Sequence, residues 1–261
     1  MSRTLKRISA GSIELVSLTT RGSRYDAPKT RAEKQKASSE AQRRMNAIYS
    51  RQKLELILAA NFPTAGSGLV VTLTYDDRHM PKTRKQAMKR WNDFLGDLRK
   101  ARRDAGLPEL VAVSCVEVLT SEGGRWHHHA VINNTGHDLD MIRACWRGGS
   151  DIEARKLRVD AEKNHESLAR YMTKEARELL DYDSKPGQRG WTCTRNAKRP
   201  ERDTVTVPDD YEIVIPAEAT VLLDEHRTTE WASWHVVKLR YDGAGRAARA
   251  PRARRRRRRR E

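Results

Sequence analysis

Apolar residues recur at helical spacing in several parts of the chain. In residues 83–106, Met88, Trp91, Leu95 and Leu98 follow one another at intervals of three, four and three residues. This spacing predicts an amphipathic helix that ends at Gly106. Similar patterns predict helices over residues 31–60 and 160–180, and a shorter helix over residues 137–146.

Runs of β-branched and apolar residues, bounded by glycine or polar residues, predict strands. The clearest runs cover residues 69–75, 109–119 and 125–134. The glycine-containing turn "SEGG" at 121–124 joins the second run to the third, which predicts an antiparallel hairpin. Weaker strand-like segments lie at 151–159, 189–196, 203–207, 211–215, 220–223 and 234–241.

The order strand, helix, strand, turn, strand, helix indicates an α+β fold, in which helices pack on one face of an antiparallel sheet. One compact domain is expected over residues 31–215. Residues 1–30 are polar and basic and predict a flexible arm. Residues 216–242 predict a β-like extension, and residues 243–261 a disordered arginine-rich tail.

Charge separates the two ends of the chain from its middle. The net charge is +17, and the excess lies in residues 1–60, at +8, and in residues 243–261, at +9. Residues 61–242 are balanced, with 29 basic and 29 acidic side chains. Basic ends favour a polyanionic partner, so we expect Arg254, Arg255 and Arg256 to contact nucleic acid. A solubilising or targeting tail is the alternative.

The cysteines and the hydropathy indicate a reducing compartment and no membrane span. Cys115, Cys145 and Cys193 form an odd set without paired spacing, which argues against a disulfide framework. No run of about 18 apolar residues occurs. The basic N-terminus lacks the long apolar stretch of a signal peptide. A cytoplasmic protein is expected.

The segment "GGRWHHHAVINN", residues 123–134, carries the candidate chemistry. Strand alternation places His127 and His129 on one face and His128 on the other. Glu117, on the preceding strand, is the natural third ligand of a divalent ion. A four-residue loop would set Glu117 opposite His128, whereas an odd loop or a glycine bulge would set it beside His127 and His129. Structural histidines are the alternative.

Tyr171 and Lys174 lie three residues apart in the predicted helix "SLARYMTKEA" and therefore share a helix face. A phenol is a poor nucleophile at neutral pH because its pKa is about 10. A nearby cation and a metal-bound phosphate would make it useful, and Lys174 can supply the cation. A packed tyrosine beside an exposed lysine is the alternative interpretation.

In combination, these motifs resemble the HUH endonucleases, which include rolling-circle replication initiators of phages and plasmids. The segments "NFPTAGSGLVVTLTY", "GRWHHHAVIN", "LARYMTKEA" and "RGWTCTRNAKRP" are similar to replication-associated proteins of phages, prophages and mobile elements. That group is related to the filamentous-phage replication nickase. The resemblance covers roughly residues 40–215 and implies a bacterial host cell. It also implies that "HHH" is the family's His-hydrophobic-His motif, here with His128 in the middle.

The resemblance implies a role for each matching residue. His127, His129 and Glu117 would hold Mg²⁺ or Mn²⁺, Tyr171 would be the single nucleophile, and Lys174 would accompany it. A set of further residues is expected near DNA: Arg125, Trp126, Arg195, Asn196 and Lys198, with Trp191 as a second base-stacking candidate.

The activity implied is nicking and joining of single-stranded origin DNA through a covalent 5′-phosphotyrosine, which initiates rolling-circle replication. A host polymerase would extend the freed 3′ end, and a host helicase would be a further partner. Two alternatives stay open from the sequence. One is a relaxase or transposase of a mobile element, and the other is a basic nucleic-acid-binding protein without enzymatic activity.

Overall fold

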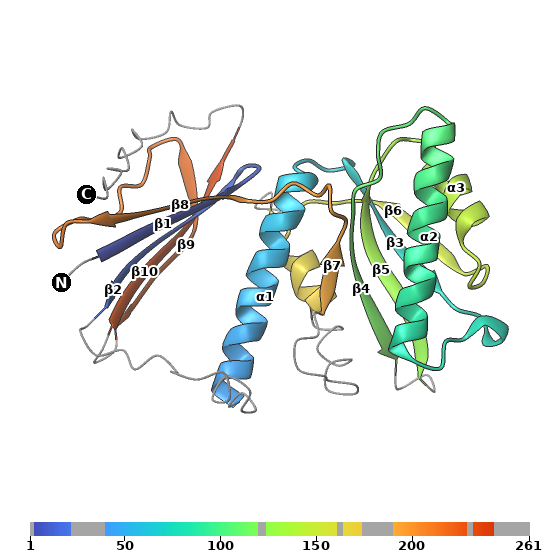
Figure 1. Cartoon of the computed structure of the whole chain (residues 1–261). Coiled ribbons are helices and arrows are strands. Elements are labelled where there is room, and N and C mark those ends of the chain that lie inside the picture. Colours follow the sequence, from blue (N-terminus) through green and yellow to red (C-terminus); the bar gives the residue numbers. More distant parts are fainter. Residues whose placement is uncertain are drawn as a thin grey trace, which may run out of the picture. The chain divides into compact units, whose positions relative to one another are not determined.

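The computed structural model describes residues 3–21, 40–119, 124–160, 164–173, 190–228 and 232–242. The chain forms two compact units, each with its own five-stranded antiparallel sheet (Figure 1). The larger unit is Ser38–Arg199, and the smaller unit combines Met1–Ala37 with Pro200–Glu261. The predicted α+β class is confirmed. The chain has two units where one compact domain was expected.

The sheet of the larger unit has the strand order β6-β3-β5-β4-β7. Its strands are β3 (Gly68–Thr74), β4 (Ala112–Leu119), β5 (Arg125–Asn133), β6 (Ile152–Lys156) and β7 (Trp191–Cys193). The histidine strand β5 is central, because β3 pairs with it on one side and β4 on the other. The predicted hairpin is therefore present, and both neighbours of β5 can place side chains beside its histidines.

Helices cover both faces of this sheet rather than the single face expected. On one face, α1 (Glu40–Asn61) packs Leu54 and Leu58 against Val70 and Val131. On the other face lie α2 (Arg84–Asp104) and α3 (Asp138–Cys145). The two central strands carry apolar residues at successive positions, so both faces offer apolar surface that must be covered.

The sequence predicted α2 closely. The Thr83 side chain caps the helix by accepting a hydrogen bond from the backbone N–H of Gln86. The predicted inner residues Trp91 and Leu98 are almost fully buried. Gly106, with a φ of 67°, adopts the left-handed conformation that ends many helices.

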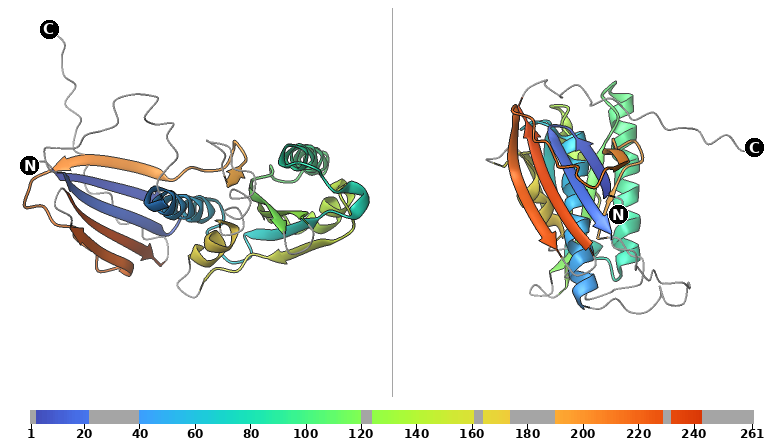
Figure 2. Two further views of the ribbon diagram at one scale, coloured as in Figure 1. Left: turned by 90° about the horizontal axis from the view of Figure 1, so that it is seen from below. Right: turned by 90° about the vertical axis from the view of Figure 1, so that its left-hand side faces the viewer.

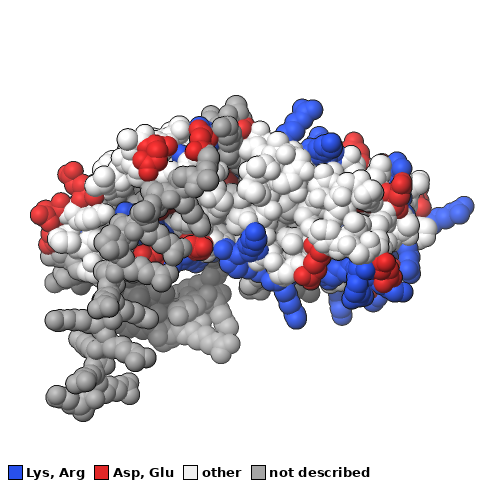
Figure 3. All heavy atoms as spheres, turned by 90° about the horizontal axis from the view of Figure 1, so that it is seen from above, with Lys and Arg blue, Asp and Glu red and all other residues white. Residues whose placement is uncertain are grey.

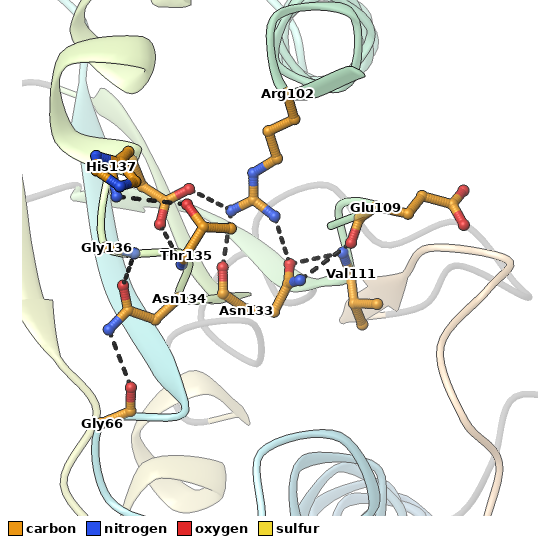
Figure 4. A network of polar contacts seen from close by, with 10 residues as sticks. Gly66, Arg102, Glu109, Val111, Asn133, Asn134, Thr135, Gly136 and His137 are labelled. Atoms are coloured by element: carbon orange, nitrogen blue, oxygen red, sulfur yellow. Dashed lines mark hydrogen bonds and ion pairs between the residues drawn. The ribbon is translucent and has the colours of Figure 1, made fainter. Parts of the chain in front are cut away.

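A buried ionic network fixes the C-terminal end of β5 (Figure 4). The Arg102 guanidinium on α2 donates to the Asp138 carboxylate at 2.6 Å and to the side chain and backbone oxygens of Asn133 at 2.6 and 2.7 Å. Both charged side chains are at most 1% exposed. Asp138 also accepts the backbone N–H of Thr135 at 2.7 Å. The network therefore joins β5, α2 and α3 through paired polar groups.

Replacing Arg102 with alanine is expected to destabilise the larger unit by about 3–5 kcal/mol, because the Asp138 carboxylate would stay buried without its cation. Urea unfolding followed by tryptophan fluorescence measures the change. Lys89→Ala is the matched control on the same helix, since the Lys89–Asp93 pair is exposed and such pairs contribute little. Similar unfolding midpoints for the two variants would contradict the prediction.

The smaller unit contains a sheet in the order β8-β1-β2-β10-β9 (Figure 2). Its strands are β1 (Arg3–Ala10), β2 (Ile13–Arg21), β8 (Glu201–Val207), β9 (Ala219–Thr228) and β10 (Ala232–Tyr241). The flexible N-terminal arm predicted over residues 1–30 is thus wrong for residues 3–21, which form a hairpin. Alternate apolar residues explain the correction: Leu5, Val16 and Leu18 join Val237 and Leu239 in a buried cluster.

The expected C-terminal extension belongs to this same sheet. The segments predicted at 203–207, 220–223 and 234–241 lie in β8, β9 and β10. The segment 211–215 is not a strand, although Tyr211 and Ile213 pack against the buried cluster. The arginine-rich tail from residue 243 lies outside the described residues. Among the described helices, none is long and apolar enough to cross a membrane.

Candidate functional site

The register of the β4–β5 hairpin places Glu117 beside His127 and His129. Leu119 pairs with Arg125, which leaves five residues, 120–124, between the strands. This odd-length connection sets Glu117 directly opposite His127. Gly124 has a φ of 83°, a conformation that suits glycine. Opposite residues of an antiparallel pair project from the same face, so all three candidate ligands share one side of the sheet.

Glu117 and His129 are hydrogen-bonded and buried. The distance from His129 Nε2 to Glu117 Oε2 is 2.9 Å, and the two residues are 7% and 4% exposed, His129 first. The rings of His127 and His129 are nearly parallel, with centroids 6.4 Å apart. The two imidazoles therefore project side by side from β5 with the carboxylate next to them.

Two threonines of β3 hold the opposite edge of each imidazole. The Thr72 hydroxyl lies 3.2 Å from Nδ1 of His129, and the Thr74 hydroxyl lies 3.2 Å from Nδ1 of His127. Each threonine is the direct cross-strand partner of its histidine. Such contacts fix ring orientation and tautomer, which leaves Nε2 available for an acid or a cation. The sequence signal was the alternation within "TLTY", to which no role was assigned.

Glu117, His127 and His129 are chemically suited to a divalent ion. Two imidazoles and a carboxylate form a donor set that favours Mn²⁺ and related ions over Mg²⁺, which prefers oxygen ligands. The buried carboxylate fits the same interpretation, because a charge is seldom buried without a partner. An ion bound by these residues would replace the proton that His129 and Glu117 share.

His128 belongs to the other face and to the hydrophobic core. It is 1% exposed, and its Nε2 lies 2.9 Å from the Tyr75 hydroxyl. Its ring stacks on Trp91 with centroids 5.2 Å apart. Burial, followed by the nearby charges of His129 and His127, lowers the pKa of His128 to about 3. The middle histidine is thus a neutral core residue, and the pair open to a ligand is His127 with His129.

Acid is expected to destabilise the protein through its buried histidines. The pKa values of His128 and His165 are lowered chiefly by burial, so below about pH 6.5 the unfolded chain binds protons that the folded chain does not. The stability from neutral His128 is fully present above about pH 6.5 and is lost as the pH falls toward its folded-state pKa of about 3. Between about pH 7 and pH 5 we expect a loss of about 2 kcal/mol from His128 alone. Urea unfolding at several pH values measures it, and an unchanged slope in His128→Leu would contradict it.

Tyr171 lies against the same face as the two imidazoles. Residues 166–173 are helical, and this helix is anchored by Ala169 and Met172, which are 0% and 1% exposed. The Tyr171 ring meets the His129 ring edge to face, with centroids 5.5 Å apart, and the residue is 44% exposed. The predicted nucleophile is therefore next to the candidate ligands and open to solvent. Lys174 lies outside the described residues.

A basic cavity adjoins Tyr171. It has a volume of about 870 Å³, and Tyr171, Ser167 and Leu168 line one part of it. Arg155, Lys156 and Arg158 line another part, at and just beyond the end of β6. Arg155 pairs with Val70 of β3, whose side chain is on the face that carries His127 and His129. The sequence analysis missed these basic residues, and the signal was the segment "EARKLR" after a glycine-rich loop.

The DNA-contact candidates near the histidines have structural partners. Trp126 is 6% exposed and packs in the core on the His128 side, so its expected role in base stacking is wrong. Strand parity explains this, because Trp126 and His128 are two residues apart. Arg125 donates to the Tyr75 carbonyl at 2.9 Å and to Asp77 at 2.7 Å.

The candidates in "TRNAKRP" lie in a turn after β7. Arg195, Asn196 and Lys198 are exposed. Asn61, at the end of α1, holds the backbone of Lys198 through hydrogen bonds of 2.8 and 3.0 Å, and Asn196 donates to the Leu110 carbonyl at 3.2 Å. Trp191 is half-buried, with its indole N–H donating to Ser50 at 3.1 Å. Arg254, Arg255 and Arg256 lie outside the described residues.

The larger unit thus defines a class of α+β protein that presents a His-x-His strand, a neighbouring glutamate and a helical tyrosine on one face of an antiparallel sheet. Residues 68–176 match the model of a family described as replication-associated protein, ORF2 type. The matched segment contains Glu117, His127, His129, Tyr171 and Lys174. The match confirms the resemblance to replication-associated proteins and supports a role in replication. Comparison with curated proteins and with solved structures gives no match.

Proposed function

We propose that the protein nicks and rejoins single-stranded DNA through a covalent tyrosine link and thereby initiates rolling-circle replication, as an HUH-type endonuclease. One observation carries the proposal: Glu117, His127 and His129 share a face of the sheet, and the Tyr171 ring contacts His129 there. A merely structural histidine strand would not require an acid, two parallel imidazoles and an exposed phenol in one place.

The proposed step is a transesterification. The Tyr171 hydroxyl oxygen attacks the scissile phosphorus, loses its proton and forms a phosphotyrosine with the 5′ end. The bond from phosphorus to the 3′ oxygen breaks, and that oxygen takes up a proton to become a free 3′-hydroxyl. One phosphoester bond forms for each one broken, so the reverse reaction rejoins strands without an external energy source.

Glu117, His127 and His129 would hold Mn²⁺ or Mg²⁺, which supplies charge neutralisation at the phosphate. Thr72 and Thr74 would keep the two imidazoles oriented through their Nδ1 contacts. Lys174, one helical turn after Tyr171, would stabilise the phenolate or the phosphate. The same tyrosine would carry both the cleavage and the joining steps.

Basic side chains beside the site support a DNA substrate. Arg155, Lys156 and Arg158 in the cavity next to Tyr171 can neutralise successive phosphates of a single strand. Lys and Arg side chains also gather on the face of the larger unit seen in Figure 3. In the sequence of α2, the exposed basic residues include Lys85, Lys100 and Arg103.

The test is formation of a covalent protein–DNA adduct. The full chain is incubated with Mn²⁺ and a set of single-stranded oligonucleotides that tile the DNA flanking its own gene, and the products are separated on a denaturing gel. The expected result is one oligonucleotide that yields a shifted protein band and a shorter fragment with a 3′-hydroxyl. Salt-sensitive binding without any adduct would instead favour a nucleic-acid-binding protein. Genes for conjugation or transposition beside this one would favour a relaxase or a transposase.

A further inference from the structure

The smaller unit carries a second cluster of potential metal ligands, far along the sequence from the histidine strand. Asp224 and His226 are two residues apart on β9 and therefore project from the same face. His235 on β10 pairs directly with His226, and Val237 pairs with Asp224. The register thus brings one carboxylate and two imidazoles together across a pair of strands.

The side-chain geometry of this cluster is tight. The centroids of the His226 and His235 rings are 3.6 Å apart, with the planes inclined by 24°. His235 Nε2 lies 2.8 Å from Asp224 Oδ1. One potential ligand atom from each residue lies within 4.8 Å of the other two. Among the residues that the structure describes, this is the one group of three acidic, histidine or cysteine side chains that meets that distance.

The surroundings also suit a bound cation. On one side of the cluster are the buried apolar residues Leu18, which pairs with His235, and Val237. The other side is open, since Asp224 and His226 are exposed. Apolar backing strengthens electrostatic interactions, and the open side leaves room for a water ligand. Glu225 and Arg227, at alternate positions on β9, pair with each other at 2.8 Å on the opposite face.

We propose that Asp224, His226 and His235 bind a divalent transition-metal ion, with Zn²⁺ as the best match. Two imidazoles and one carboxylate favour zinc, nickel or copper over magnesium or calcium. Such an ion clamps β9 to β10 and stabilises the folded smaller unit in proportion to its occupancy. The proposal is independent of the nuclease function, because its three ligands all belong to the smaller unit.

The test measures zinc binding in a full chain that lacks the other candidate site. The background variant is Glu117→Gln/His127→Gln/His129→Gln, stripped with a chelator and titrated with Zn²⁺ by calorimetry. One equivalent of zinc is expected to bind and to raise the thermal midpoint. Adding His226→Gln/His235→Gln is expected to abolish both effects. Adding His79→Gln instead is the control, since His79 pairs with Asp76 in the larger unit, and it should leave both effects unchanged.

A conservative variant keeps the test decisive if the double histidine variant unfolds. Asp224→Asn preserves the size of the side chain and both imidazoles, and it should weaken zinc binding without changing the midpoint measured in chelator. Retention of the full equivalent in the double histidine variant would overturn the proposal. So would the absence of zinc binding in the background variant, or equal losses in the His79→Gln control.

Discussion

Replacing Tyr171 with phenylalanine is expected to abolish the covalent protein–DNA adduct, a loss of more than about 1,000-fold in cleavage rate. Phenylalanine retains the ring that meets His129 edge to face but lacks the oxygen that would attack the phosphorus. The variant should therefore fold and bind DNA as the original protein does. Denaturing gels of the Mn²⁺ reaction measure the adduct, and gel shifts measure the binding.

A matched tyrosine controls for the change of residue type. Tyr49 on α1 is 51% exposed, and Tyr49→Phe should leave adduct formation unchanged. An adduct that persists in Tyr171→Phe would show that another residue is the nucleophile. Such a result would separate the metal-site part of the proposal from its tyrosine part, because the ligands of the metal would be untouched.

The second large effect is expected at the three ligands. His127→Ala and Glu117→Gln should each remove tight Mn²⁺ binding and lower cleavage by more than about 100-fold, because each deletes a donor atom. Titration of Mn²⁺ followed by electron paramagnetic resonance measures the binding directly. Cleavage rates under single-turnover conditions measure the chemical effect without interference from product release.

His128 supplies the contrast within the same tripeptide. His128→Leu should retain Mn²⁺ binding, because the side chain lies on the opposite face of β5. It should lose about 1–3 kcal/mol of stability, since the buried Tyr75 hydroxyl would lose its partner. Adding Tyr75→Phe should recover part of that loss. Loss of metal binding in His128→Leu would contradict the assignment of His127 and His129 as the ligand pair.

Strand parity made the histidine site predictable, whereas the register could be narrowed but not decided. Alternation alone separated His128 from His127 and His129. The position of Glu117 depended on whether the turn held an even or an odd number of residues, and both were compatible with "SEGG". The same alternation also places Trp126 with His128 in the core, so the DNA-stacking expectation conflicted with a signal already present in the sequence.

The smaller unit could not be foreseen because its pairings are long-range. Arg3 pairs with Thr20, but it also pairs with Val207, about two hundred residues away. The segment 3–21 is rich in polar side chains and predicts irregular structure when it is considered alone. Only the partner strands from the other end of the chain complete its apolar face. The basic cavity residues of β6 were missed for a related reason, since their importance comes from a helix that follows in the sequence.

The interleaved sheet of the smaller unit constrains the order in which the protein can be built. Its two N-terminal strands lie between β8 and β10, so during synthesis they emerge first and must wait for the last quarter of the chain. The larger unit is complete by residue 199 and can fold while the rest is still being translated. The protein would therefore acquire its replication-associated unit before its two ends are joined, and the early hairpin would stay exposed in the meantime.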